Sequence, residues 1–216
     1  MSISAKMVKE LRAITGAGMM DCKKALVEND GDVAKATEYL QKKSLAAVAK
    51  RAGKVAAEGA VFSYIHDNRI GALIEVNCET DFVARGESFQ VLIKDLAMQV
   101  VASNPSYVDA SEIPEEVTAK QVEIYSAQLL EEGKPAAMID RIIPGKIKKW
   151  HSEVCLLNQA FIKDDKKSVD QYIAEASSSS GEKIKMRRFI RFELGQGIEK
   201  KEEDFAAEVA AAISDT

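Results

Sequence analysis

The stretch EVNCETDFVARGESF, residues 75–89, joins a strand-like pattern to a helix-like pattern, and the chain is organised around this junction. Before it, apolar residues alternate with the period of a strand that has one buried face: Ile70, Ala72, Ile74 and Val76. After it, apolar residues recur with the spacing of an amphipathic helix: Phe89, Leu92, Ile93, Leu96, Ala97, Val100 and Val101. Between the two patterns, Thr80 can cap the start of a helix and Gly86 can break a turn. We therefore expect an exposed, functional connection here.

Composition limits the possible functions. The chain has 216 residues and a formal net charge of −4, and 30% of its residues are charged. This length suits one domain with a small additional module, and the lack of a basic excess argues against nucleic acid as the main partner. The longest apolar runs are too short to span a bilayer, and the start of the chain lacks the pattern of a signal peptide. We therefore expect a cytoplasmic protein with no membrane partner.

The residues available for chemistry are few. The three cysteines, Cys22, Cys78 and Cys155, are widely spaced and form no CxxC pair, so we expect no disulfide framework and no metal site. Cys78 with His66 could supply a nucleophile and a base, but no third group that would orient the histidine is evident. We therefore expect a protein with no catalytic residues and no cofactor, and a thiol enzyme that uses Cys78 is a minor alternative.

Nucleotide and RNA sites are also poorly supported by the sequence. The glycine pairs at residues 16–18 and 195–197 lack the lysine and the strand-to-helix context of a phosphate-binding loop, so we expect no direct nucleotide binding. A basic run near the end of the chain could form an RNA-binding stripe, but a solvated face or a contact with an acidic protein surface is the simpler interpretation. The run comprises Lys183, Lys185, Arg187, Arg188 and Arg191.

Residues 1–54 predict a compact helical module. Three short helices are marked by apolar residues and separated by Gly16 and Gly18 and by residues 29–32. Residues 44–54, which are rich in alanine, lysine and arginine, predict a helical linker with a solvated basic face. Met19 and Met20 are either core residues or an adaptable contact surface, and the sequence leaves both interpretations open.

Residues 55–200 predict an α/β core. Segments 60–65 and 70–77 indicate a hairpin, with Asp67 and Asn68 in its tight turn. Two helices are expected after prolines 114 and 135, and Pro144 predicts a kink or a restart in the second. Ser168 can cap a helix through residue 176, and residues 177–181 predict a flexible loop.

The last part of the chain predicts a strand and a terminal helix. Apolar residues fall on alternate positions of a long strand, which we expect to complete a three-stranded antiparallel sheet with the hairpin: Ile184, Met186, Ile190, Phe192 and Leu194. Residues 201–216 place apolar side chains four residues apart, as in a helix with a narrow apolar stripe: Phe205, Val209 and Ile213. The chain is thus expected to be an α+β protein divided at about residues 54 and 200.

Three motifs resemble those of the bacterial elongation factor Ts family. They are CETDFVAR at residues 78–85, LRAITGAGMMDCKKAL at residues 11–26, and FIRFELG at residues 189–195 with GIEK after it. The motifs occur in the order of the family and together extend over nearly the whole chain. Three positions depart from the family pattern, which has an acidic residue at Pro144, a proline at Ala160 and commonly an acidic residue at Gln196.

The resemblance implies a function in nucleotide exchange on the GTPase elongation factor Tu. From the residues alone, Asp81 could simply be a carboxylate favoured at a helix start and Phe82 a ring folded into the core. By position in the motif, the resemblance instead implies that Phe82 is the ring that enters the GTPase and dislodges its magnesium ion, that Asp81 is a polar anchor, and that Thr80 and Val83 belong to the same loop. The resemblance also implies a fold of the ubiquitin-associated type for residues 1–54.

Further contacts with elongation factor Tu are expected from Arg12, Met19 and Met20 in the helical module and from Phe205 in the terminal helix. Longer family members carry two core subdomains, whereas this chain has one copy, so a homodimer in a 2:2 complex is implied. A different class of function rests on residues 1–54 alone, which could form a ubiquitin-like or helical-peptide binding module without exchange activity.

Overall fold

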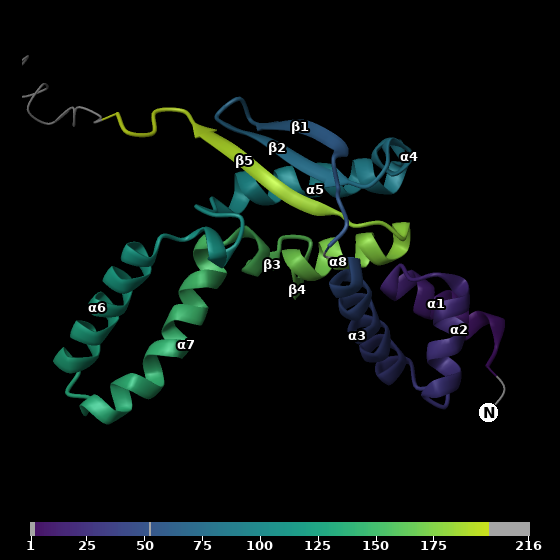
Figure 1. Cartoon of the computed structure of the whole chain (residues 1–216), viewed down its shortest axis with the longest axis horizontal. Coiled ribbons are helices and arrows are strands. Elements are labelled where there is room, and N and C mark those ends of the chain that lie inside the picture. The colour runs from purple at the N-terminus through teal and green to yellow at the C-terminus, as the bar shows by residue number, and fades with distance from the viewer. Residues whose placement is uncertain (1–2, 52, 199–216) are drawn as a thin grey trace, which may run out of the picture.

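The computed structural model describes residues 3–51 and 53–198, and it combines helices with a small sheet (Figure 1). The first elements are helices α1 (Ala5–Thr15), α2 (Met19–Glu28) and α3 (Val33–Arg51). Then come strands β1 (Glu58–His66) and β2 (Ile70–Cys78) and helices α4 (Asp81–Arg85) and α5 (Glu87–Ser103). The middle of the chain forms the 3₁₀ turn η1 (Ala110–Glu112) and helices α6 (Glu115–Glu131) and α7 (Ala136–Val154). The last elements are η2 (Leu156–Asn158), β3 (Ala160–Phe161), β4 (Asp164–Ser168), α8 (Val169–Ser180) and β5 (Lys185–Glu193).

Helices α1 to α3 pack around a small apolar core of their own. Ser4 caps α1 by accepting a hydrogen bond from the backbone N–H of Met7 at 3.3 Å, and Gly16 ends the helix with a φ of 66°. The buried residues follow the apolar pattern of the sequence: Val8, Leu11, Cys22, Ala25, Leu26, Ala36 and Leu40. The predicted three-helix module is therefore confirmed.

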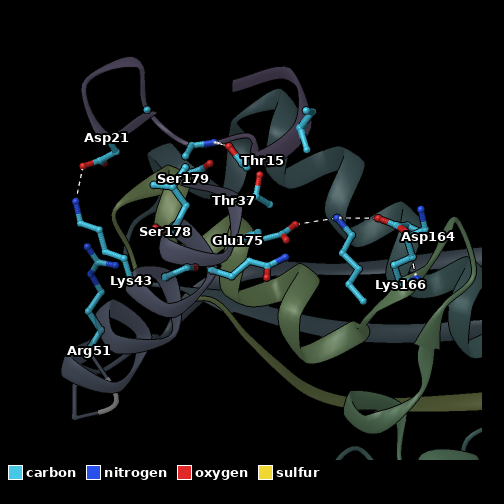
Figure 2. A pocket seen from close by; sticks show the side chains of 17 residues that line it. Thr15, Asp21, Thr37, Lys43, Arg51, Asp164, Lys166, Glu175, Ser178 and Ser179 are labelled. Atoms are coloured by element: carbon cyan, nitrogen blue, oxygen red, sulfur yellow. Dashed lines mark hydrogen bonds and ion pairs between the residues drawn. The ribbon is translucent and has the colours of Figure 1, made fainter. Parts of the chain in front are cut away.

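The helical module of α1 to α3 packs against helix α8. Helix α3 continues to Arg51, so most of the predicted helical linker is the second half of this helix. On it, Ser44 is buried and donates its hydroxyl to the carbonyl oxygen of Ala174 in α8 at 3.0 Å. Ser179 of α8 donates to the carbonyl oxygen of Gly16 at 2.9 Å. A pocket of about 370 Å³ lies beside these contacts, between the module and α8 with β4 (Figure 2).

The sheet is three-stranded and antiparallel, in the order β1-β2-β5, as predicted. Asp67 and Asn68 take positive φ values of 49° and 53° in the turn between β1 and β2, which confirms their predicted role. On central strand β2 the alternate apolar residues are buried against the helices: Ala72, Ile74, Val76 and Cys78. The α+β fold class expected from the sequence is therefore confirmed.

A β-bulge in β5 changes which side chains face the core. Alternate residues share a face in a regular strand, so the pattern over residues 184–194 places Met186, Ile190 and Phe192 together. The register with β2 instead passes over Arg187, and the facing reverses at that point. Met186 is buried, whereas Ile190 and Phe192 are exposed on the opposite face of the sheet.

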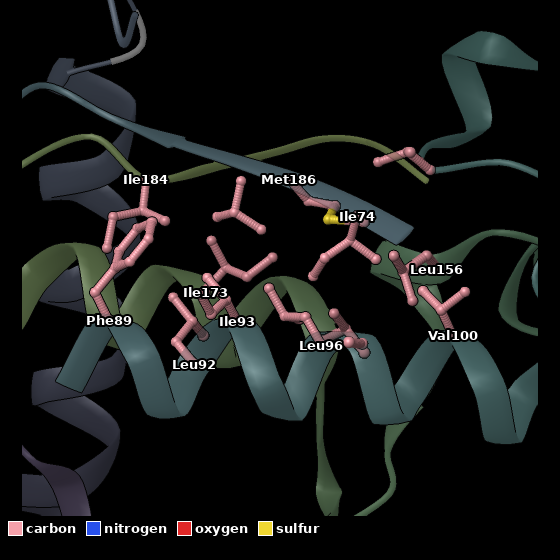
Figure 3. Close-up of a cluster of buried hydrophobic side chains, with 14 of the residues drawn as sticks. Ile74, Phe89, Leu92, Ile93, Leu96, Val100, Leu156, Ile173, Ile184 and Met186 are labelled. Carbon is pink, nitrogen blue, oxygen red and sulfur yellow. The ribbon is translucent and has the colours of Figure 1, made fainter. Parts of the chain in front are cut away.

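Helix α5 covers the inner face of the sheet, and α8 lies beside it (Figure 3). Every residue of the apolar stripe predicted for α5 is buried: Phe89, Leu92, Ile93, Leu96, Ala97, Val100 and Val101. Side chains from the sheet and from α8 complete the cluster, among them Ile74, Met186 and Ile173. This core fixes the end of β2 and the start of α5, and thus the junction between them.

Helices α6 and α7 form a hairpin that projects away from the sheet (Figure 1). Pro114 and Pro135 stand immediately before the two helices, as predicted. Pro144 lies inside α7, which continues through it as a single helix, so the helix does not restart there. Leu129 and Ile139 are the buried side chains of α6 and α7.

Residues 177–181 do not form the flexible loop that was predicted. They are the last turn of α8 and its C-terminal cap, because α8 extends to Ser180 and Gly181 ends it with a φ of 76°. The helix begins with a capping box in which Ser168 and Gln171 bond each other's backbone N–H groups. Serine-rich composition suggests a loop, but the caps at both ends and burial of one face favour the helix.

The remaining expectations about organisation fall outside what the structure tests. The terminal helix predicted for residues 201–216, including Phe205, lies outside the described residues. The described residues form two separate buried clusters, one within α1 to α3 and one beneath the sheet. The division of the chain at residues 54 and 200 stays a prediction.

Candidate functional site

The junction between β2 and α5 is a tight turn that carries the short helix α4. Strand β2 ends at Cys78, whose thiol donates to the carbonyl oxygen of Thr80 at 3.1 Å. The hydroxyl of Thr80 accepts from the backbone N–H of Val83 at 3.4 Å, so Thr80 is the N-cap of α4, as the sequence predicts. Gly86 is both the C-cap of α4 and the N-cap of α5.

The single turn of α4 separates an inward side from an outward side. Ala84 is buried and Val83 packs against the main core, whereas Phe82 points away from the protein and is 85% exposed. Asp81 pairs with Arg85 at 3.2 Å, an exposed ion pair along the helix. A phenylalanine exposed to this extent buries little of its ring in its own fold, so its side chain is available to a partner. The roles of residues 80–83 in partner binding stay predictions.

Two carboxylates fasten this turn to the segment between α8 and β5. Glu182 accepts hydrogen bonds from the backbone N–H groups of Glu79 and Thr80, at 3.1 and 3.0 Å, and from the hydroxyl of Thr80 at 2.6 Å. In the opposite direction, Glu79 accepts from the backbone N–H of Lys183 at 2.7 Å. Glu79 also pairs with Lys54 at 2.7 Å. The sequence did not predict the bonds of Glu182 to Thr80 and of Lys183 to Glu79, since no local pattern relates residues about a hundred positions apart.

The environment of Glu79 favours its charged form. The hydrogen bond from the ammonium group of Lys54, followed by that from the backbone N–H of Lys183, lowers the pKa of the Glu79 carboxyl below its ordinary value. The turn is therefore held by an ionised carboxylate at neutral pH.

The structure does not support a thiol enzyme at Cys78. Burial raises the pKa of the Cys78 thiol, which disfavours the reactive thiolate. Cys78 pairs with Glu58 at one end of the hairpin, whereas His66 pairs with Ile70 at the other end. The two side chains that would form nucleophile and base are therefore not brought together.

The candidate contact residues of the helical module are all exposed. Arg12 lies on α1, and Met19 and Met20 open α2 with exposed fractions of 39% and 77%. The interpretation of Met19 or Met20 as a core residue is therefore wrong, and an adaptable contact surface remains. Figure 1 places α4 and the pair α1 and α2 at the same end of the molecule. Phe205, the fourth candidate, is outside the described residues.

Two hollows flank the contact between the module and the core. In the pocket of Figure 2, charged side chains largely neutralise each other: Asp21 pairs with Lys43 at 2.6 Å and Glu175 with Lys167 at 2.8 Å. A more apolar groove of about 520 Å³ lies on the side of the turn, and Val83 is among its lining residues. Arg51, which also lines the pocket of Figure 2, is an exception to the charge pairing there, because its buried Nη1 has no hydrogen-bond partner among the described residues.

The described residues contain neither a cluster of metal-binding side chains nor a membrane-spanning helix. Among residues 3–51 and 53–198, no three histidine, cysteine, aspartate or glutamate side chains gather as a metal site would require. Within the same described part of the chain, no helix is both long enough and apolar enough to cross a bilayer.

Comparison with known proteins identifies the family of the chain. A sequence model of the family "Elongation factor TS" matches residues 3–196. The chain is 56% identical to a protein of Geobacter sulfurreducens named Elongation factor Ts, over 98% of this chain and 99% of that protein. It is also 56% identical to the protein of that name from Desulforamulus reducens, over 98% of each chain. The Carboxydothermus hydrogenoformans protein of that name is 54% identical, again over 98% of each chain.

The match is not confined to the helical module, so it does not favour a protein that acts through residues 1–54 alone. It includes the turn with Phe82, the sheet and the hairpin of α6 and α7. The chain therefore belongs to the elongation factor Ts family of translation elongation factors.

Proposed function

We propose that this protein is the guanine nucleotide exchange factor of elongation factor Tu and acts in the cytoplasm. The observation that carries the proposal is the exposed ring of Phe82, held out on a short helix within the motif CETDFVAR. Residues 80–83 enter the GTPase, and the ring of Phe82 wedges between side chains there. The disturbance displaces the magnesium ion that holds the phosphates, and GDP leaves.

One ring is not enough for efficient exchange. Burying a phenylalanine contributes about 1.5 to 3 kcal/mol, whereas a ten-thousandfold faster release of nucleotide requires about 5.5 kcal/mol, at about 1.4 kcal/mol per factor of ten. Additional contacts must supply the difference. The exposed Arg12, Met19 and Met20 lie at the same end of the molecule as α4 and are suited to do so, and Phe205 is a further candidate.

Exchange requires no bond-making by this protein. If the factor weakens the binding of nucleotide to the GTPase, nucleotide must weaken the binding of the factor to the same extent, because coupling between two ligands is reciprocal. The factor therefore leaves when nucleotide returns. It needs no nucleotide site, metal ion or catalytic side chain of its own.

The proposal is tested by replacing Phe82 with alanine. In a stopped-flow assay with elongation factor Tu and a fluorescent GDP analogue, Phe82→Ala should slow nucleotide release by about tenfold to a hundredfold, the value of one buried ring. It should still associate weakly with the GTPase through the remaining contacts. Ile124→Ala, which truncates an exposed apolar side chain on α6, is the matched control and should leave release unchanged. Normal release with Phe82→Ala would remove this ring from the mechanism.

We also propose that two copies associate through the outer face of the sheet, which would give a 2:2 complex with elongation factor Tu. That face exposes large apolar side chains on all three strands and just beyond β5: Val61, Ile65, Leu73, Ile190, Phe192 and Leu194. An exposed apolar patch of this kind is typical of an interface. In sedimentation velocity, Leu73→Asp should convert a dimer into a monomer, and Ile162→Asp on the β3–β4 hairpin should not. A wild-type protein that sediments as a monomer would refute this part.

A further inference from the structure

We propose that Glu182 is a positioning residue for nucleotide exchange, because its carboxylate holds the turn that presents Phe82. This inference rests on the proposed function. Glu182 lies between α8 and β5, a hundred residues along the chain from the turn. Glu182 acts through Thr80 and not through a contact with the ring of Phe82.

The carboxylate of Glu182 accepts three hydrogen bonds from the turn. One oxygen, Oε2, accepts from two successive backbone N–H groups, those of Glu79 at 3.1 Å and Thr80 at 3.0 Å. The other, Oε1, accepts from the hydroxyl of Thr80 at 2.6 Å. Hydrogen bonds to an ionised carboxylate are shorter and stronger than those between neutral groups. Both the backbone and the side chain of Thr80 are therefore fixed by one residue.

Thr80 connects Glu182 to the helix that carries Phe82. Thr80 is the N-cap of α4, and its hydroxyl also accepts from the N–H of Val83, so fixing this side chain fixes the first turn of the helix. Phe82 is the second residue of that helix. Since its ring is 85% exposed, packing within the protein does little to orient it. The backbone of α4 is what sets the direction of the ring.

Glu182 is itself held in place by the end of helix α8. The hydroxyl of Ser177, a buried side chain in the last turn of α8, donates to the carbonyl oxygen of Glu182. The backbone N–H of Glu182 donates to the hydroxyl of Ser180 at 3.3 Å. Gly181, with a φ of 76°, turns the chain between helix and strand. The carboxylate is thus presented by a capped helix end rather than by a free loop.

The reciprocal bond completes the connection. Glu79 accepts from the backbone N–H of Lys183 at 2.7 Å, so each of the two segments supplies a carboxylate to the backbone of the other. If Glu182 is removed, this second bond keeps the segments near each other, but the cap of α4 is released. The ring of Phe82 then samples more orientations, and the fraction of molecules ready to insert it falls.

The test compares Glu182→Ala with Glu182→Gln in the full-length protein. Alanine removes all three bonds, and we expect release of fluorescent GDP from elongation factor Tu to slow by about tenfold or more, within the range that small misplacements of a reacting group produce. Glutamine can accept both backbone N–H groups with its oxygen and donate its amide to Thr80, so it should keep most of the rate. Glu175→Ala, which removes a carboxylate from the nearby helix α8, is the matched control and should support normal nucleotide exchange.

Two readouts separate positioning from a general loss of structure. Hydrogen–deuterium exchange of a peptide spanning residues 78–82 should show protection in the wild type and loss of it in Glu182→Ala, with unchanged protection in α5. In a double-mutant cycle, adding Glu182→Ala to Phe82→Ala should slow release by less than about twofold further, because a residue that acts only through the ring has nothing left to position.

The outcomes are distinguishable. Normal release by Phe82→Ala refutes the proposed function, and Glu182 then has no ring to position. Slow release by Phe82→Ala together with normal release by Glu182→Ala overturns the role of Glu182 alone, as does full additivity in the double mutant. If Glu182→Ala does not fold, hydrogen–deuterium exchange of the wild type still tests the role of Glu182. A peptide 78–82 that is unprotected in the intact protein would contradict the hydrogen bonds on which the inference depends.

Discussion

Replacing Phe89 with alanine should destabilise the protein severely, whereas the same change at Phe82 should leave stability almost untouched. Phe89 is 2% exposed beneath the sheet, and truncating a buried phenylalanine costs about 3 to 5 kcal/mol. Phe82 is 85% exposed, so only about a seventh of its surface is covered, and its truncation should cost about 0.2 to 0.5 kcal/mol. For a chain of this size, 1 kcal/mol corresponds to about 2 to 4 °C in Tm. We therefore expect Phe89→Ala to melt about 6 to 20 °C below the wild type.

Urea unfolding followed by far-ultraviolet circular dichroism measures both free energies. The variants and the wild type must be compared at one protein concentration, because association of copies would make the apparent stability concentration-dependent. A loss of more than about 1 kcal/mol for Phe82→Ala would mean that the ring packs within its own fold. That result would refute the assignment of Phe82 as an outward-facing contact residue, even if exchange were also impaired.

Three further substitutions test the sheet, helix α7 and the turn. Gly59→Ala should cost at least about 3 kcal/mol in thermal unfolding, because at a φ of 139° the added Cβ would lie 2.1 Å from the carbonyl oxygen of Val76. Gly145 lies in a helix, and a Cβ added there would meet open space, so Gly145→Ala should instead stabilise the protein by about 0.5 to 1 kcal/mol. Equal changes in stability for the two glycine variants would contradict the geometry. The lowered pKa of Glu79 means that its bonds stabilise the fold above the ordinary value of 4.5 and are lost as the pH falls through the lower folded value. The difference in urea midpoint between wild type and Glu79→Gln should therefore be largest near neutral pH and shrink below pH 4.5, and a difference independent of pH would exclude this origin.

Periodicity alone was sufficient to predict the sheet, helix α5 and the junction between them. The alternation at Ile74 and Val76 and the helical spacing from Phe89 onward each reflect one buried face, which is a local property of the sequence. Exposure of Phe82 was not predictable from periodicity, which equally allows a ring packed in the core, and it was expected only from the resemblance of CETDFVAR to the family motif. In the structure, Val83 and Ala84 fill the inward side of the single helical turn.

Tertiary contacts explain what periodicity could not predict. Glu182 bonds Thr80 across a separation of 102 residues, and no spacing rule pairs such positions. The bulge at Arg187 depends on register with β2, so alternation along β5 alone assigns Ile190 to the wrong face. The serines from Ser177 onward read as a loop by composition, but they become helical because α8 is capped at both ends and packed on α3.

The hairpin of α6 and α7 can unfold locally while the rest of the protein stays folded. Leu129 and Ile139 are the only buried side chains of α6 and α7, all of whose residues the structure describes, and the packing of the hairpin against the rest of the protein is concentrated near η2. Segments with little apolar burial open at lower free energy than the global unfolding reaction. We expect its amide protons to exchange through sub-global opening, well before those of β2 and α5. Proteolytic nicking or added helical turns in this arm should thus spare the remainder of the molecule.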